Sequence, residues 1–153
     1  MAPSSKAKNY NPAKLIITFN HLVLGGVTLS GRAKGKFFDC DFYSDMAKLY
    51  VGADGEGARA ISNDLSGFIS VSVMQTASII DYFNRAVQLD RAFGTGQLSI
   101  NVNDILGNFV ASAAGAWCKK PPKIERADDI KEDVWVWDTA LLIRTDGSAF
   151  PTA

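Results

Sequence analysis

Histidine is almost absent from this chain of 153 residues, since His21 is the only one. A metal site or an imidazole base would depend on this single residue beside a turn, and we interpret His21 as a solvent-facing turn residue. The GxGxxG, P-loop, GxSxG and HExxH motifs are also missing from the sequence. We therefore predict no enzyme, no catalytic residue, no metal site and no cofactor.

Cysteine is scarce as well, and no long apolar run occurs. Cys40 and Cys118 lie in predicted strands outside any CxxC pattern, which favours buried free thiols over a disulfide or a metal site. No segment approaches the length of a membrane span, and the first residues, MAPSSKAKNYNP, lack the apolar core of a signal peptide. We expect a protein of the cytoplasm without a membrane anchor.

The chain also lacks an excess of charge of either sign. Lysine plus arginine and aspartate plus glutamate both number 16, which argues against an electrostatic binder of nucleic acid or of membrane surfaces. The length and the 47% hydrophobic content fit one domain with a real core. We predict an N-terminal arm at residues 1–12, which contain Pro3 and Pro12, and a single domain at residues 13–153.

Alternation of apolar and polar residues is the dominant pattern in this sequence. The clearest strand follows Gly67, where Ile69, Val71 and Val73 share one face and Ser70 and Ser72 the other. Similar patterns predict strands in several other segments. These are residues 14–20, 36–43, 45–51, 97–103, 109–119 and 134–144, with a further short strand after the Gly/Asp-rich turn 52–57 and turns at 21–26 and 104–108.

Only one helix is indicated, with an apolar stripe from Ile79 to Leu89, Ser78 as its cap and Gly94 as its stop. The fold class predicted is mainly β, an antiparallel β-barrel or sandwich of seven or eight strands with one flanking α-helix.

The final predicted strand, residues 134–144, is apolar on both faces. Trp135, Trp137, Leu141 and Ile143 share one side. A strand buried on both sides needs a second covering surface, which another subunit can supply. The two tryptophans at alternating positions are more typical of core than of base or sugar stacking.

Three charged clusters have two interpretations each. Asp54 and Glu56, with Asp64 nearby, imitate a calcium loop, but their spacing fails that pattern and favours a hairpin turn. Asp39 and Asp41 have the spacing of paired catalytic carboxylates, although a solvated or pore-facing surface is the more common meaning. The lysines at 119, 120 and 123 suggest phosphate binding, but acidic residues follow at once and favour a solvated loop.

Three segments together resemble the tail tube proteins of contractile-tailed bacteriophages. They are YNPAKLIITFN, VGADGEGARAISNDLSGFISVSVMQTAS, and WCKKPPKIE followed by the tryptophan-rich final strand, and they span Tyr10 to about Ile143. The resemblance implies a tail-tube-like fold shared with type VI secretion tubes. It also implies hexameric rings stacked into a virion tail tube in the host cytoplasm, which conducts genomic DNA without specific binding and meets tail sheath, baseplate and tail terminator proteins.

From this resemblance and the strand patterns we predict two assembly surfaces. Small polar and acidic side chains are expected to face the lumen: Asp39, Asp41, Ser70, Ser72, Gln97, Ser99 and Asn101. The Gly/Asp turn and a later loop, with residues 1–12, are expected to contact the next ring, through Gly52, Asp54, Gly55, Glu56, Arg59, Lys123 and Glu125. The alternatives are the tube of a secretion or contractile injection system, or a small β-barrel binding module.

Overall fold

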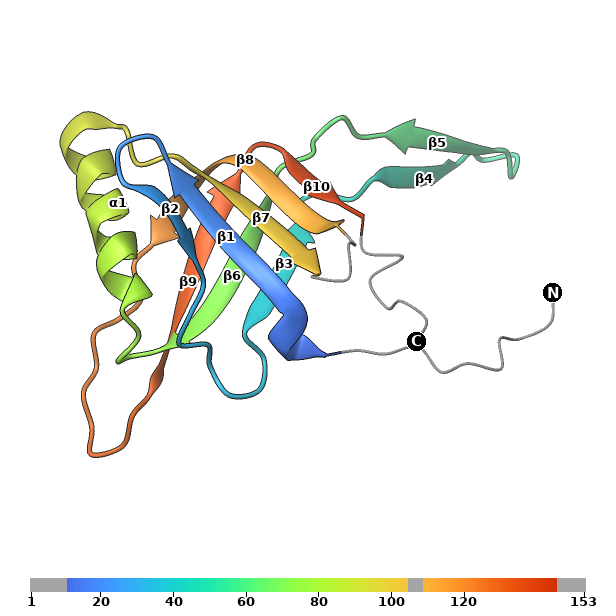
Figure 1. Cartoon of the computed structure of the whole chain (residues 1–153). Coiled ribbons are helices and arrows are strands. Elements are labelled where there is room, and N and C mark those ends of the chain that lie inside the picture. The colour runs from blue at the N-terminus through green and yellow to red at the C-terminus, as the bar shows by residue number, and fades with distance from the viewer. Residues whose placement is uncertain (1–10, 105–108, 146–153) are drawn as a thin grey trace.

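The computed structural model of the chain describes residues 11–104 and 109–145, and these residues form a mainly antiparallel β structure with one α-helix (Figure 1). A short 3-10 helix, Pro12–Lys14, precedes the strands. The elements that follow are β1 (Leu15–His21), β2 (Gly25–Thr28), β3 (Phe38–Phe42), β4 (Ala47–Val51), β5 (Gly57–Ile61), β6 (Gly67–Met74), α1 (Ile79–Phe93), β7 (Leu98–Asp104), β8 (Phe109–Lys120), β9 (Glu132–Thr139) and β10 (Leu142–Arg144).

Eight strands form one antiparallel sheet in the order β2-β1-β7-β8-β9-β6-β3, with β10 also paired to β8. The segment from Leu29 to Phe37 leaves β2 at one edge and enters β3 at the other. On the way, Ala33 N donates to Ser72 O at 3.0 Å, and Ser72 N donates to Phe37 O at 3.0 Å. Because Leu29 of the same segment donates to Ile17 O of β1 at 2.7 Å, the segment connects β1 with β6, and the sheet curls back on itself in the manner of a barrel. The predicted fold class is confirmed.

The core lies between the inner face of this sheet and α1. Phe83 of the helix packs edge-on against Phe19 with ring centroids 4.9 Å apart and against Trp137 at 5.2 Å. Ile79, Phe83 and Ala86 are the buried residues of the helix, as its apolar stripe predicts. Trp135 and Trp137 are both buried, so the interpretation of the tryptophans as core is confirmed.

The helix begins and ends where the sequence predicts, but its cap differs. Gly94 stops it in the left-handed region at φ 66°, where its N–H donates to Asp90 O. Ser78 makes no side-chain capping bond, so its predicted role is wrong. Its φ of −67° and ψ of −23° are already helical, whereas a capping serine needs extended backbone to turn its oxygen toward the first turn.

The predicted final strand is interrupted at residues 140–141. Thr139 Oγ1 accepts a bond from Leu141 N at 3.2 Å and donates to Leu141 O at 3.1 Å, so this side chain replaces ladder bonds at the break. The break shifts the alternation of buried and exposed side chains by one residue. Leu142 is therefore buried, while Leu141 and Ile143 are exposed. The prediction that Leu141 and Ile143 share the face of the tryptophans is therefore wrong.

Other boundaries depart less from expectation. The predicted turn 21–26 is shorter in the structure, because β2 begins at Gly25, whose register partner is His21 of β1. The predicted arm and the turn at 104–108 fall largely on residues 1–10 and 105–108, which lie outside the described part of the chain.

Candidate assembly surfaces

The hairpin of β4 and β5 projects away from the rest of the molecule (Figure 1). Its strands pair only with each other, in a separate two-stranded sheet. A two-stranded hairpin is marginal in water without a surface to pack against. Its outer edges also leave backbone groups open to pairing with another chain. The hairpin therefore has the architecture of an element that a partner completes.

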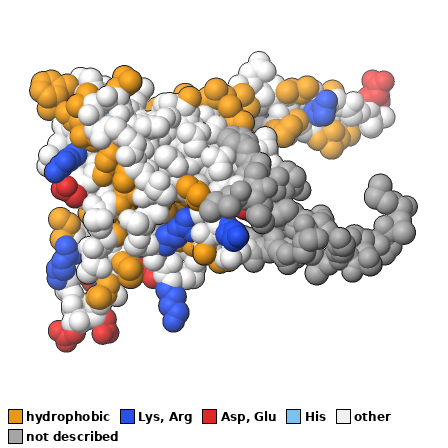
Figure 2. Space-filling model, viewed as in Figure 1, with side chains coloured by type: hydrophobic (Ala, Val, Ile, Leu, Met, Phe, Trp, Pro, Cys, Tyr) orange, Lys and Arg blue, Asp and Glu red, His pale blue; other side chains and the backbone are white. Residues whose placement is uncertain are grey.

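One face of this hairpin, called its apolar face below, carries large apolar side chains together with Arg59. Leu49 lies opposite Arg59 and Ala47 opposite Ile61, so odd-numbered residues of both strands share a face. The large side chains on it stand in solvent, with Leu49 74%, Val51 64% and Ile61 65% exposed. Figure 2 shows apolar side chains along the projection, with charged groups among them. Adjacent exposed side chains of this size on a projecting element mark an interaction surface.

The turn that joins the two strands has a defined shape. Gly52 N donates to Glu56 O at 2.7 Å, and Gly55, at φ 89°, takes a conformation that glycine alone adopts easily. Asp54 Oδ1 accepts the Glu56 N–H at 3.2 Å, so this carboxylate organises the turn. The hairpin-turn interpretation is confirmed. No group of three or more His, Cys, Asp or Glu residues suited to a metal is present in residues 11–104 and 109–145.

The two legs of the hairpin are joined at its base by Asp64. Its Oδ2 accepts a bond from Ser44 Oγ at 2.6 Å, and its Oδ1 accepts the Ser66 N–H at 2.9 Å. These bonds to the charged form lower the pKa of Asp64 from 3.8 to about 2. The nearby hydroxyl of Tyr43 donates to Asp138, and burial together with this bond raises the pKa of Tyr43 to about 12. Together with the backbone bond from Tyr43 N to Ser66 O at 3.1 Å, Ser44 and Asp64 thus help to fix how the hairpin leaves the sheet.

The residues predicted to face a lumen lie on the sheet face turned away from the core. Ser70 and Ser72 alternate with the fully buried Ile69, Val71 and Val73 of β6. Asp39 is the register partner of Ser70, which brings the predicted residues of β3 and β6 together. Ser99 and Asn101 alternate with Leu98, Ile100 and Val102 of β7 in the same way, and Gln97 is exposed just before this strand.

Two strands separate these two groups. Because β8 and β9 lie between β7 and β6, about 14 Å of sheet separates Asn101 from Ser70. The groups share a face but do not converge on a binding site. Val136 and Val134 of β9 lie beside Ser70 and Ser72 on this face, and Val134 is 48% exposed, so the predicted strand is not buried on both sides. A wall of mixed polar and apolar side chains fits this arrangement better than a pocket does.

Asp39 and Asp41 do not form a catalytic pair. Asp39 makes an ion pair with Lys36 at 3.0 Å, and Asp41 Oδ1 accepts the N–H of Phe42 at 2.8 Å. A shared proton requires two carboxylates that meet in a dry site, whereas Asp41 is exposed. Each carboxylate therefore has its own local partner, and the negative charge of Asp39 is offset by Lys36.

The predicted contact loop with Lys123 and Glu125 is tied to the end of β6. Gln75 Nε2 donates to Glu125 O at 2.6 Å, and Lys131 makes an ion pair with Glu125 at 3.2 Å. Figure 1 shows this loop, between β8 and β9, at the opposite end of the molecule from the β4–β5 hairpin. The two predicted contact regions therefore form separate surfaces, one at each end.

His21 is a buried structural residue, so the interpretation as a solvent-facing one is wrong. Its Nδ1 accepts the N–H groups of Val23 at 3.0 Å and Leu24 at 3.3 Å. With Nδ1 as the acceptor, Nε2 carries the proton and donates to Thr95 O at 2.5 Å. The burial of His21 could not be predicted from the sequence, because its second hydrogen-bond partner, the Thr95 carbonyl, is 74 residues away.

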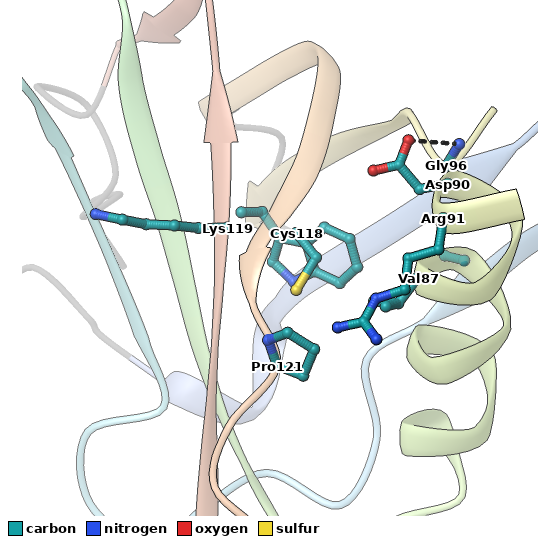
Figure 3. A pocket seen from close by; sticks show the side chains of 9 residues that line it. Val87, Asp90, Arg91, Gly96, Cys118, Lys119 and Pro121 are labelled. Atoms are coloured by element: carbon teal, nitrogen blue, oxygen red, sulfur yellow. Dashed lines mark hydrogen bonds between the residues drawn. The ribbon is translucent and has the colours of Figure 1, made fainter. Parts of the chain in front are cut away.

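A small pocket of about 110 Å³ lies between α1 and β8 (Figure 3). Arg91 and Val87 of the helix reach toward Cys118 and Pro121, while Asp90 Oδ1 accepts the Gly96 N–H at 3.3 Å. Burial raises the pKa of Cys118 to about 11, which keeps the thiol protonated and a poor nucleophile. Neither Cys118 nor Cys40 is in a disulfide within the described ranges. The pocket does not supply an activated nucleophile.

Comparison with known proteins supports the fold. The chain has a tail-tube-like or cap-like fold, a mainly antiparallel β structure with one helix. In particular, the chain matches the cryo-EM structure of the anti-feeding prophage cap, the AFP tube terminating cap, with a TM-score of 0.56 and 12% identity over 95% of this chain and 97% of that chain. No family model and no curated protein matches the sequence.

Among the described residues, no helix is long and apolar enough to cross a membrane.

Proposed function

We propose that this chain is a structural subunit of a contractile-tail particle, which assembles into rings that stack on the tail tube. The observation that carries the proposal is the β4–β5 hairpin, whose apolar face and unpaired edges require a partner. The match to a tube terminating cap over nearly the whole chain supports the same class of particle.

In the form that the resemblance implies, six copies make a ring and the rings stack into a bacteriophage tail tube. Lateral contacts close the ring, and axial contacts through the hairpin at one end and the Lys123–Glu125 loop at the other extend the stack. The polar face with Asp39, Ser70 and Asn101 lines the lumen, where small side chains and negative charge let DNA pass without a binding site. Sheath, baseplate and terminator proteins are the remaining partners.

The match to a cap favours a second candidate within this class. A cap binds the end of a tube and stops its growth, so only one of its ring faces receives another ring. A tube subunit of a secretion or contractile injection system is the related alternative. In each case the chain works through binding surfaces and not through catalysis.

Negative-stain microscopy of the purified protein separates these candidates. Tubes of indefinite length indicate a tube subunit, and single rings that cover only one end of added tail tubes indicate a cap. A sample that stays monomeric at every concentration, with or without tail tubes, contradicts both and leaves the small β-barrel binding module as the better interpretation.

A further inference from the structure

An apolar groove of about 330 Å³ lies beside the C-terminal half of α1. Val23 and Leu24 of the β1–β2 turn form one wall, Leu89 and Phe93 of the helix form the other, and Arg85 stands at the rim. Phe93 is 75% exposed and Val23 73% exposed. Apolar side chains from two elements thus face solvent together in the isolated subunit.

Hydrogen bonds beneath the groove fix the positions of its two walls. His21 binds the backbone of Val23 and Leu24, and through Thr95 it fastens this turn to the loop after the helix. Tyr82 Oη donates to Gly25 O at 2.6 Å, which ties the helix to the start of β2. Both walls are therefore fixed before any partner arrives, and this lowers the ordering cost of binding.

We propose that this groove receives the apolar face of the β4–β5 hairpin of a second copy of the chain. The inference rests on the proposed stacking of subunits and names the surface that each hairpin meets. Leu49, Val51 and Ile61 enter between the β1–β2 turn and the helix, so that exposed apolar side chains cover each other on both copies.

Charge complementarity with this occupant is confined to the position of Arg85 relative to the acidic turn. The hairpin carries Asp54 and Glu56 at its turn and Arg59 on the face that enters the groove. Arg85 stands at the groove rim, where it makes an exposed ion pair with Asp81 at 3.1 Å. Arg85 and Phe93 are eight residues apart, about 12 Å along a helix. Gly52, where the acidic turn begins, is three residues beyond Leu49, about 10 Å along a strand. With Leu49 beside Phe93, the acidic turn therefore reaches Arg85.

The positions of the two surfaces also favour a second copy. Figure 1 shows the hairpin and the end of α1 at opposite ends of the molecule, and Figure 2 shows apolar side chains gathered at both. Two complementary surfaces at opposite ends of one chain make a head-to-tail contact, which extends into a stack as copies add.

Disulfide trapping between two differently labelled variants tests the contact. In a background with Cys40→Ser and Cys118→Ala, one preparation carries Leu49→Cys and the other Phe93→Cys, and the two are mixed and oxidised. The matched control replaces Phe93→Cys by Ile124→Cys, which lies at the other contact loop and is 84% exposed. We expect a mixed dimer from the first pair and at least about tenfold less from the second.

A second measurement does not depend on cysteine. Phe93→Asp is expected to raise the concentration needed for stacking about tenfold or more, since it places a charge in the contact. Val134→Asp should change it much less, because Val134 is exposed beside Ser72 on the sheet face assigned to the lumen. Circular dichroism confirms that both variants are folded.

The outcomes separate this inference from the proposed function. If microscopy shows stacked rings but Leu49→Cys pairs with Ile124→Cys or with neither partner, the groove is not the receiving surface, although the stacking proposal stands. If Phe93→Asp stacks like the unmodified chain, the groove is likewise excluded. If the unmodified chain never forms rings or stacks, the proposed function fails and this inference fails with it.

Discussion

Ser44 and Asp64 join the two legs of the projecting hairpin through a single hydrogen bond of 2.6 Å from Ser44 Oγ to the carboxylate. The bond forms to the charged carboxylate, as does the bond from the Ser66 N–H. Because the hairpin makes no strand pairing with the main sheet, these bonds at its base help to decide its direction. Assembly through the hairpin therefore depends on residues that contact no partner themselves.

Acid is expected to break the hydrogen bonds that Asp64 accepts where the hairpin joins the sheet. The pKa of Asp64 is lowered to about 2, so its stabilising bonds are complete above its ordinary pKa of 3.8 and are lost as the pH falls through about 2. An NMR titration that follows the Ser66 amide should show a midpoint near 2. In Asp64→Asn this acid step should disappear, and a midpoint near 3.8 in the unmodified chain would show that the bonds do not form.

Replacement of Leu49 by serine should weaken assembly without weakening the fold. Leu49 is exposed in the subunit, and exposed substitutions usually change the free energy of unfolding by less than about 0.5 kcal/mol. Light scattering measures assembly, and urea unfolding measures stability. Leu98→Ser is the contrasting variant, because this buried leucine should cost several kcal/mol, about 2–5 for loss of the side chain. Normal assembly of Leu49→Ser would rule out the apolar face as a contact.

His21→Phe should destabilise the subunit. It removes the acceptor for the Val23 and Leu24 N–H groups and the donor to Thr95 O, with a cost of about 0.5–1.5 kcal/mol for each hydrogen bond lost. Urea unfolding measures the change, and Leu22→Ser is a control because the adjacent Leu22 is fully exposed. A stability equal to that of the unmodified chain would contradict the structural role given to His21.

Removal of residues 1–10 should leave the fold intact and weaken stacking. The truncation stops before Pro12, because the Pro12 carbonyl accepts a bond from Arg32 Nη1 at 2.7 Å and belongs to the folded unit. Thermal unfolding tests the fold, and microscopy tests the stack. Normal stacks from the shortened chain would count against a role for the arm.

The sequence is informative where one physical pattern acts alone. Strict alternation from Gly67 onward predicts β6 and its two faces, and the 3.6-residue stripe with Gly94 predicts α1 to within a residue. The strand β2 carries no such pattern, since Gly25 and Gly26 have no side chains to alternate, and it exists because β1 provides its pairing partners.

Side-chain bonds to the backbone explain the other differences between the predicted and the observed structure. The break before β10 depends on the bonds of Thr139 Oγ1 to the backbone of Leu141. A threonine within an apolar run does not predict these bonds. His21 is buried because Thr95 accepts its second bond. For the assembly surfaces, sequence indicates the turn with Asp54 and Glu56, but the separation of the hairpin from the sheet and the groove beside Phe93 follow only from three-dimensional packing.

The mass of the purified protein in solution tests the central claim most directly. Size-exclusion chromatography with light scattering should give a species at six times the 16.5-kDa subunit mass, or larger stacks of this unit, as the concentration rises. A single species of 16.5 kDa at every concentration that stays in solution would contradict the account of this chain as a ring-forming tail subunit.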